Sequence, residues 1–400
     1  MPHRVLFIDI NNNSCIVKLP SLFHQSGMQC FGLSREKDLL FKSSYLSQKY
    51  GLVEREGNVH FSDLLKSTFF AMKHGKPDFL ITNEEQVLHR FIEAVEIIKE
   101  RDPNNEDEAR FVELISASMV QDKNLLLRPY SQQVAQNAGF LIPDHKTITD
   151  SDTLNEVLET HPRPFYLKVS ITVGGQGVFK IEEHHKTEWI EHALTAFTPP
   201  SEARPYLIQN PVEGKEMTIS FAAFKGKLLG YTVAEPLKKL VDGGPSSYLQ
   251  THYRPDLESN ISNFVKLTGY SGFGGFDIIE EPSSKASYVI EANMRLTHSV
   301  PASRQQGTNL VQLLSAAIKG EEPAYQLPIH GKSKVKIALY PEEAMRYPES
   351  PHLEDGLVAA PWADPGAMIG LAPFIKRDLK YPTRDIEAQY KKHIEGTNAV

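Results

Sequence analysis

The sequence is poor in cysteine and carries no excess of positive charge. Only two cysteines, Cys15 and Cys30, occur among the 400 residues, so neither a disulfide framework nor a cysteine-based metal site is expected. A reducing compartment is the simpler interpretation, and one optional bridge between the two thiols stays open. The formal net charge is −7, with 43 Lys and Arg against 50 Asp and Glu. This balance argues against a broad surface that binds nucleic acid.

Long apolar runs are also missing. No stretch approaches the roughly 18 apolar residues of a membrane span, and the run from Val5 to Ile8 before Asp9 is too short for a signal peptide. We therefore expect a soluble, cytoplasmic protein that binds no membrane. With 40% hydrophobic and 23% charged residues, the composition is that of a globular protein, and its length suggests about two to four domains.

The turn after the first apolar strand lacks glycine. It reads Asn11-Asn12-Asn13-Ser14, where a dinucleotide-binding fold needs G-x-G-x-x-G, and this weakens the case for a nicotinamide enzyme. The alternating apolar runs that follow still indicate a β-α-β layer. The 15 histidines show no H-x-x-x-H or H-E-x-x-H spacing, so a zinc hydrolase is not expected.

The most informative motif is a predicted β-hairpin, FGGFDIIEE followed by SYVIEANMR. If it folds about Ser284, Asp277 lies opposite Glu291, and period-two alternation places Asn293 on the same face. Two carboxylates and an amide oxygen suit a hard cation such as Mg²⁺. Arg295, further along that face, could meet a phosphate or a carboxylate. On spacing alone, a solvated polar face of a sheet is an equal alternative.

A second segment, FYLKVSITVGGQGVFKI, has Lys168 on a predicted strand before Gly174, Gly175 and Gly177. Glycines let backbone N–H groups approach phosphate oxygens, and the lysine adds a positive charge. The spacing matches no standard phosphate loop, and taken alone the segment favours a flexible hairpin. Upstream, a helical pattern from Asp122 to Gly139 is interrupted by Pro129.

A third segment, YLIQNPVEGKEMTISF, contains a strand that reaches Gln209, breaks at Pro211 and resumes before Glu216. Such a break can present free backbone groups to a planar base, and Glu216 could accept hydrogen bonds from sugar hydroxyls. By itself the segment is typical of an edge strand that contains a proline.

In chain order these segments resemble the ATP-grasp superfamily of ATP-dependent ligases, which includes D-alanine ligase and biotin carboxylase. The resemblance covers about residues 122 to 320, and the E-x-N-x-R string ending at Arg295 is its most specific part. It implies an ATP-grasp fold of the α/β (α+β) class. The expected parts are an N-terminal β-α-β domain (1–117), an ATP-grasp domain (118–330) and a C-terminal extension (331–400) that completes the catalytic subdomain. Within the ATP-grasp domain, the lid is expected at about 125–200 and the catalytic subdomain at about 201–330.

The resemblance also implies residue roles. The expected metal ligands, for Mg²⁺ or Mn²⁺, are Asp277, Glu291 and Asn293. The expected catalytic residues are Arg295, which would steady the transferred phosphate, and Lys168. The expected ATP-binding residues are Lys123, Lys168, Gly174, Gly175, Gly177, Gln209, Val212 and Glu216. Many relatives are acidic where this chain has Gln209, which leaves the contact to the base open.

The implied activity is ATP-dependent ligation of a carboxylate to an amine through an acyl phosphate, with release of ADP and phosphate. The expected partners are small carboxylates and amines, amino acids among them, with a homodimer as an open expectation. Two alternatives remain: another ATP-grasp phosphotransfer, and a module that binds ATP or a partner without turnover. A degenerate site would be expected to lose a metal ligand or a phosphate cation, and all of them are present, which favours catalysis.

Overall fold

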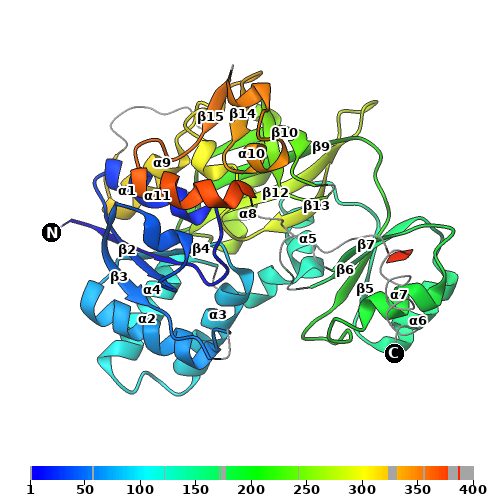
Figure 1. Cartoon of the computed structure of the whole chain (residues 1–400). Helices are drawn as coiled ribbons and strands as arrows, with labels where there is room; N and C mark the ends of the chain where they lie inside the picture. Colours follow the sequence, from blue (N-terminus) through cyan, green and yellow to red (C-terminus); the bar gives the residue numbers. More distant parts are fainter. Residues whose placement is uncertain are drawn as a thin grey trace, which may run out of the picture.

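The computed structural model describes residues 2–55, 58–120, 122–170, 172, 177–241, 243–322, 331–354, 356–376 and 386–387. In these residues, three sheets are joined and covered by helices, so the expected α/β class is confirmed (Figure 1). The strands are β1 (Arg4–Ile8), β2 (Gln29–Ser34), β3 (Leu46–Gly51), β4 (Phe79–Thr82), β5 (His145–Ile148), β6 (Phe165–Val169), β7 (Val178–Ile181), β8 (Tyr206–Gln209), β9 (Lys215–Phe224), β10 (Lys227–Lys239), β11 (Ser246–His252), β12 (Gly272–Glu280), β13 (Ser287–Asn293), β14 (Lys336–Leu339) and β15 (Leu357–Ala359). The α-helices are α1 (Leu19–Gln25), α2 (Phe61–Gly75), α3 (Glu85–Glu100), α4 (Glu106–Ser118), α5 (Arg128–Asn137), α6 (Ser151–Thr160), α7 (Thr187–Leu194), α8 (Glu258–Thr268), α9 (Leu310–Lys319), α10 (Glu342–Arg346) and α11 (Pro365–Leu371).

The N-terminal part forms a parallel sheet with the strand order β3-β2-β1-β4. The runs VLFI in β1 and FLIT in β4 are buried throughout, as expected for a parallel sheet that is covered on both faces. Both strands end at the same edge of the sheet, where the chain continues into Asp9 and into the turn before α3. This edge therefore gathers the polar residues that follow the two strands.

A seven-stranded sheet with the order β13-β12-β9-β10-β11-β14-β15 forms the centre of the molecule. Neighbouring residues of β9 point to opposite faces, so Phe221 belongs to the core cluster of α8 and Ala222 to that of α9. The cluster on the α9 side also contains residues of the N-terminal part, where Phe23 makes an edge contact with Phe273. The N-terminal part and the central sheet therefore share one core.

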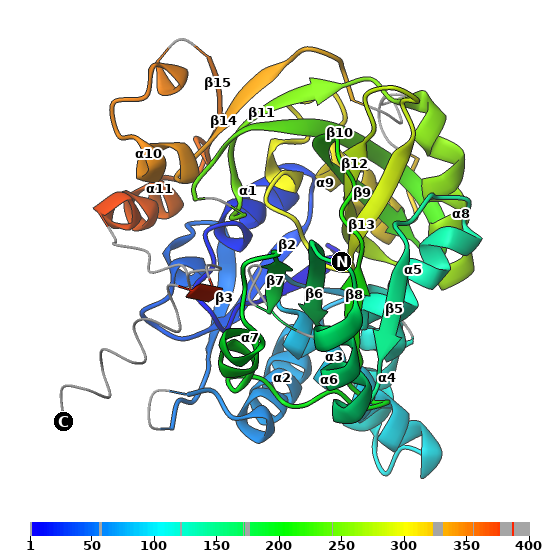
Figure 2. The same ribbon diagram turned by 90° about the vertical axis from the view of Figure 1, so that its right-hand side faces the viewer.

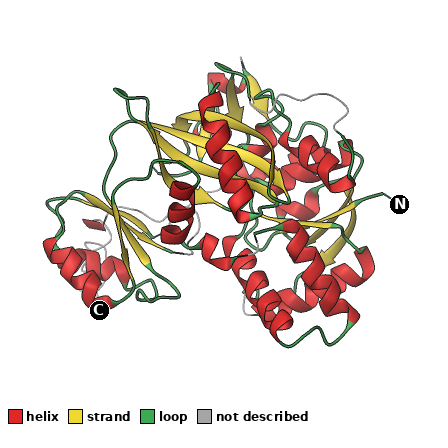
Figure 3. Ribbon diagram, turned by 180° about the vertical axis from the view of Figure 1, so that it is seen from behind, coloured by secondary structure: helices red, strands yellow, loops and turns green. Residues whose placement is uncertain are grey.

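A smaller antiparallel sheet with the order β5-β8-β6-β7 has its own core with α6 and α7. Figure 2 shows its strands from a second side, and it stands apart from the larger body in both Figure 1 and Figure 3. We call it the lid sheet. It extends to Gln209, which is nine residues beyond the expected end of the lid; the domain bounds themselves stay a prediction.

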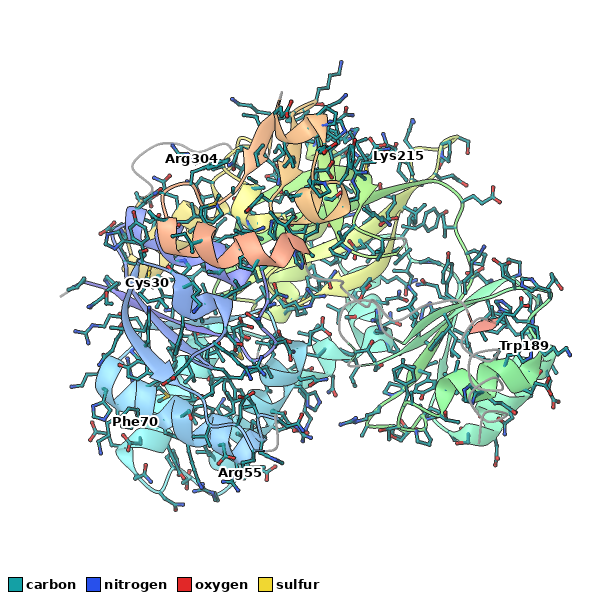
Figure 4. All side chains as sticks on the ribbon, viewed as in Figure 1. Cys30, Arg55, Phe70, Trp189, Lys215 and Arg304 are labelled. Atoms are coloured by element: carbon teal, nitrogen blue, oxygen red, sulfur yellow. The ribbon has the colours of Figure 1, made fainter. Side chains whose placement is uncertain are left out.

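The two cysteines are buried, and both are free thiols. Cys30, labelled in Figure 4, lies on β2, whereas Cys15 lies between β1 and α1. The optional bridge left open by the sequence is therefore not formed. Among the described helices, none is both long and apolar enough to cross a membrane.

Candidate active site

The expected metal ligands lie on β12 and β13 in the predicted register. Asp277 is paired with Glu291, and Gly275 is paired with Asn293, whose Nδ2 donates to Asp277 Oδ2 at 3.2 Å. A Cβ atom on Gly275 would lie only 2.3 Å from the carbonyl oxygen of Ile219 on β9, so a larger residue would push the two strands apart. The register confirms that the three polar side chains lie next to one another.

The two carboxylates of this group are half-buried, and their charges affect each other. Burial raises the pKa of Asp277 to about 6, and the neighbouring Glu291 adds to the effect. Burial acts on Glu291 in the same direction, but cations led by Arg128 and Lys168 hold the pKa of Glu291 below its usual value. A cation between the carboxylates would relieve their repulsion.

The donor set fits Mg²⁺, which prefers oxygen ligands. Asn293 can offer its amide oxygen because its nitrogen is the atom that faces Asp277. No cluster of three or more His, Cys, Asp or Glu side chains that could hold a metal is found among the described residues. The candidate metal site is therefore two carboxylates and one amide.

A β-bulge lies beside this group. The next pair of the ladder after Asp277 and Glu291 is Ile278 with Val289, so Ile290 is the extra residue of β13. Its carbonyl oxygen accepts hydrogen bonds from Gln132 Nε2 at 3.2 Å and from Lys168 Nζ at 2.7 Å. The bulge thus turns a backbone acceptor of β13 outward, where α5 and the lid sheet reach it.

Lys168 stands on β6 in the lid sheet, as the sequence predicted, and is 4% exposed. Its Nζ donates to Gln209 Oε1 at 2.6 Å as well as to Ile290. One buried ammonium group therefore links two strands of the lid sheet to β13, the strand that carries two of the expected metal ligands.

Arg128 was not singled out from the sequence, yet it lies inside the site. Its Nη1 is 2.6 Å from Glu291 Oε1, its Nε donates to the Val169 carbonyl at 3.0 Å, and its side chain is 10% exposed. The sequence feature that could have pointed to Arg128 is the neighbouring Pro129. We expected it to interrupt a helix, but α5 begins at Arg128, with the proline in the first turn, where it lacks only an N–H that would be unpaired anyway.

Arg295 follows β13 and is bound by the N-terminal part. Its Nε donates at 3.1 Å to Oε1 of Glu85, the first residue of α3. Burial works against the charge of this guanidinium, but Glu85, Glu291 and Asp277 raise the pKa of Arg295 above its usual value. Arg295 is therefore a charged group at the boundary between the expected metal ligands and the edge of the N-terminal sheet.

Lys123, the other expected phosphate cation, has a different environment. It lies in a 3-10 turn (Lys123–Leu126), and its Nζ forms an ion pair with Glu96 of α3 at 2.6 Å. Its side chain is 36% exposed, against 10% for Arg128. Arg128 is thus the basic side chain of this segment that contacts Glu291, and a phosphate role for Lys123 stays a prediction.

The remaining expected nucleotide-binding residues lie in the lid sheet, in the connection that follows β8, and on β9. Gln209 is buried at the end of β8, and Val212 is half-buried in the connection to β9. Glu216 on β9 accepts a hydrogen bond from Lys239. Gly177 has a φ of 68°, a conformation that favours glycine. Two further expectations, Gly174 and Gly175, lie outside the described residues.

Comparisons with known proteins agree on the fold. The family model described as ATP-grasp domain matches residues 130–299. No curated protein matches the sequence. The solved biotin carboxylase domain dimer of Hydrogenobacter thermophilus 2-oxoglutarate carboxylase, in complex with MgADP, ADP and bicarbonate, superimposes with a TM-score of 0.61 at 15% identity, over 84% of this chain and 73% of that one.

Two further solved structures are similar. L-amino acid ligase from Bacillus licheniformis has a TM-score of 0.57 at 15% identity, over 82% of this chain and 77% of that one. N5-carboxyaminoimidazole synthetase from Staphylococcus aureus, complexed with ADP, has a TM-score of 0.57 at 13% identity, over 84% of this chain and 82% of that one. The matched segment identifies an ATP-grasp domain within residues 130–299, and the similar solved structures confirm the ATP-grasp fold that the sequence resemblance implied.

Proposed function

We propose that the chain is an ATP-dependent ligase that joins a carboxylate to an amine through an acyl phosphate and releases ADP and phosphate. The observation that carries the proposal is the convergence of three cations on the oxygen cluster of β12 and β13. Lys168 comes from the lid sheet and Arg128 from the start of α5, while Arg295 follows β13 itself. Such an array neutralises negative charge on phosphoryl oxygens, which is the main requirement of phosphoryl transfer.

In this proposal the nucleotide lies between the lid sheet and the central sheet. Lys168 and Arg128 contact its phosphates, and the segment from Gln209 to Val212 contacts its base. Glu216 accepts hydrogen bonds from the sugar. The support is the placement of Lys168 and Gln209 in direct contact at the junction of the two sheets, together with the nucleotides present in the similar solved structures.

Asp277, Glu291 and Asn293 hold Mg²⁺ in this proposal. When bound, the ion neutralises charge on the transferring phosphoryl group. Arg128 holds the Glu291 carboxylate in place through their 2.6 Å contact, and Arg295 is held by Glu85 beside the edge where the N-terminal strands end. The substrate carboxylate therefore approaches from the N-terminal part, and Arg295 pairs with its charge.

The chemistry needs no protein nucleophile. A carboxylate oxygen forms a bond to the γ-phosphorus as the bond between that phosphorus and the β,γ-bridging oxygen breaks, and ADP leaves. The amine then forms the C–N bond, the carbon–oxygen bond to phosphate breaks, and the nitrogen gives up a proton. The likeness to L-amino acid ligase supports amino acids as the first substrates to test.

The test is a screen of amino acids and small carboxylates for amine-dependent release of ADP. Positional isotope exchange within ATP that needs the carboxylate alone would support the acyl phosphate. Stoichiometric AMP and pyrophosphate would overturn the route, and ADP release that depends on bicarbonate and leads to no amide would point to carboxylation instead.

A further inference from the structure

Polar side chains follow β1 and β4 at the edge of the N-terminal sheet. The pairing of Ile8 with Thr82 places the next residues, Asp9 and Asn83, beside each other just beyond the two strands. In the order β3-β2-β1-β4, the chain moves from β1 to β2 on one side, and β4 lies on the other side. Ligands of open α/β sheets bind at such a switch point, beyond the carboxyl ends of the strands.

The side chain of Asn83 is directed towards the segment that follows β13. Along β4, Leu80 and Ile81 belong to different core clusters. Successive side chains of a strand alternate between faces, so Asn83, two residues after Ile81, continues the face of Ile81. The cluster on that face also contains Leu296, which directly follows Arg295. Asn83 therefore faces the side of the sheet on which the chain after β13 packs.

The amide oxygen of Asn83 is buried and unpaired. Asn83 is 7% exposed, and its Oδ1 accepts no hydrogen bond among the residues that the structure describes. Buried acceptors without partners are rare in folded proteins, and each calls for an explanation. A ligand that donates a hydrogen bond at this edge would supply one.

Negative charge gathers at the same edge. Glu84 is 3% exposed, and its Oε2 accepts from a neutral group, Asn11 Nδ2, at 2.6 Å. The Glu84 side chain makes no capping hydrogen bond to α3, although it stands at the N-cap position. Its charge adds to the burial that raises the pKa of Asp9 to about 7. The guanidinium group of Arg295 is already paired with Glu85, so a further positive charge would relieve the repulsion between these carboxylates.

Our proposed function brings the substrate carboxylate to Arg295 beside this edge, and the inference that follows rests on that function. We propose that the substrate is an amino acid whose ammonium group binds to Glu84 and Asn83 while its carboxylate pairs with Arg295. The ammonium group has three N–H donors, which suit the Glu84 carboxylate and Asn83 Oδ1. Glu84 is almost withdrawn from water, and this strengthens its attraction to the cation.

This binding mode assigns separate roles to the two amino groups of the reaction. The amino group that Glu84 holds as a cation has no free electron pair, so it does not attack the acyl phosphate. The attacking amine is a second molecule. A carboxylate without an amino group would leave two buried acceptors without a donor, and sites of this kind reject such analogues strongly.

The test measures ADP release from MgATP with matched pairs of acids. Each pair is a common L-amino acid and its analogue without the amino group, such as L-alanine with propionate or L-glutamate with glutarate. Hydroxylamine is the amine in every assay, because it reacts with acyl phosphates. We expect at least one amino acid to have a kcat/KM that exceeds that of its analogue by about a hundredfold or more.

Site variants show whether this preference depends on the named residues. Glu84→Gln and Asn83→Leu should each reduce the preference by about tenfold or more, mainly through a higher KM for the amino acid, because each weakens one contact to the ammonium group. Asn83→Asp, which keeps an acceptor, should restore most of the preference that Asn83→Leu loses. Glu100→Gln, the same change at the exposed far end of α3, is the control and should leave the preference unchanged.

The inference is overturned if acids without an amino group support ADP release as well as the amino acids do. It is also overturned if the folded Glu84→Gln and Asn83→Leu chains both keep the full preference. Should these variants fail to fold, the comparison of the paired acids in the unaltered chain still decides. If no acid of either kind leads to ADP release, the proposed ligase fails, and this inference fails with it. ADP release with the analogues alone contradicts only the inference about the ammonium group.

Discussion

The guanidinium group of Arg128 lies 2.6 Å from Glu291 Oε1 and 3.0 Å from the Val169 carbonyl, so one side chain touches both the central sheet and the lid sheet. The charge of Arg128 contributes to holding the pKa of the half-buried Glu291 below its usual value. The first turn of α5 thus places a cation beside a carboxylate that we propose as a metal ligand.

Replacing Arg128 should harm nucleotide binding more than replacing Lys123. Arg128→Met removes a buried charge from the site and should weaken MgADP binding by about tenfold or more, since a hydrogen bond to a charged group is worth about 1.5–3 kcal/mol. Lys123→Met removes a partly exposed ion pair with Glu96 and should change the affinity little. Calorimetric titration of both variants with MgADP compares them directly. An equal loss of affinity in the two variants would support a role for Lys123 in nucleotide binding.

Glu291→Gln and Asn293→Ala should each abolish Mg²⁺-dependent ADP formation while leaving the fold intact. Asn293→Ala removes one oxygen ligand from the set of three, whereas Glu291→Gln removes the negative charge of another ligand, which is also the partner charge of Arg128. The measurements are ADP release and the circular dichroism spectrum. Glu159→Gln, at an exposed position of α6, is the matched control. Normal turnover in a folded site variant would disprove the metal assignment.

Gly275→Ala should destabilise the protein by about 2 kcal/mol or more, because overpacking a fitted core has this cost and the clash here is with backbone. The added Cβ would lie 2.3 Å from the Ile219 carbonyl oxygen. At Gly51, in contrast, a Cβ would meet nothing within 4 Å, so Gly51→Ala should be nearly neutral. Chemical denaturation of both variants gives the two free energies of unfolding. Similar values would contradict the prediction, because they would mean that β12 and β9 accommodate the added Cβ without loss of stability.

The buried Asp9 should make stability depend on pH. Burial, with help from Glu84, raises the pKa of Asp9 from 3.8 to about 7. The folded state therefore binds the proton of the Asp9 carboxyl group more tightly than the unfolded state does. The stability that this protonated carboxyl group contributes is fully present below about pH 4 and is lost as the pH rises towards 7. Asp9→Asn does not titrate. Relative to the unaltered chain, it should gain nothing at pH 4 and up to about 4 kcal/mol at pH 8.

The measurement for Asp9 is the free energy of unfolding of both chains across this pH range. Asp144→Asn, which removes a carboxylate at an exposed position, serves as the matched control. A constant difference between the Asp9→Asn chain and the unaltered chain at all pH values would contradict the raised pKa.

The register of Asp277 and Glu291 could be predicted because two strands joined by a short polar turn leave few ways to pair. Lys168 and Gln209 could likewise be placed on strands from their apolar neighbours. Their mutual contact could not, since it depends on β6 and β8 lying side by side, which no local pattern encodes.

The position of Arg128 in the site could not be predicted for a different physical reason. A proline is tolerated in the first turn of a helix and disruptive further inside, and the sequence alone did not show which case applied to Pro129. The order of the central sheet, with β9 between β10 and β12 and with β14 and β15 added at the far edge, also arises from packing between distant segments.

The strand that carries Glu291 and Asn293 is an edge of the central sheet, and edge strands attract the strands of other molecules. Here the outer side of β13 is occupied: Val289 donates to the Leu141 carbonyl, and the Ile290 carbonyl accepts from Lys168 and Gln132. The contacts that assemble the candidate site therefore also shield the chain from pairing with its own copies. A variant that loses Lys168 gives up part of this shield, so its solubility on storage declines together with its affinity for the nucleotide.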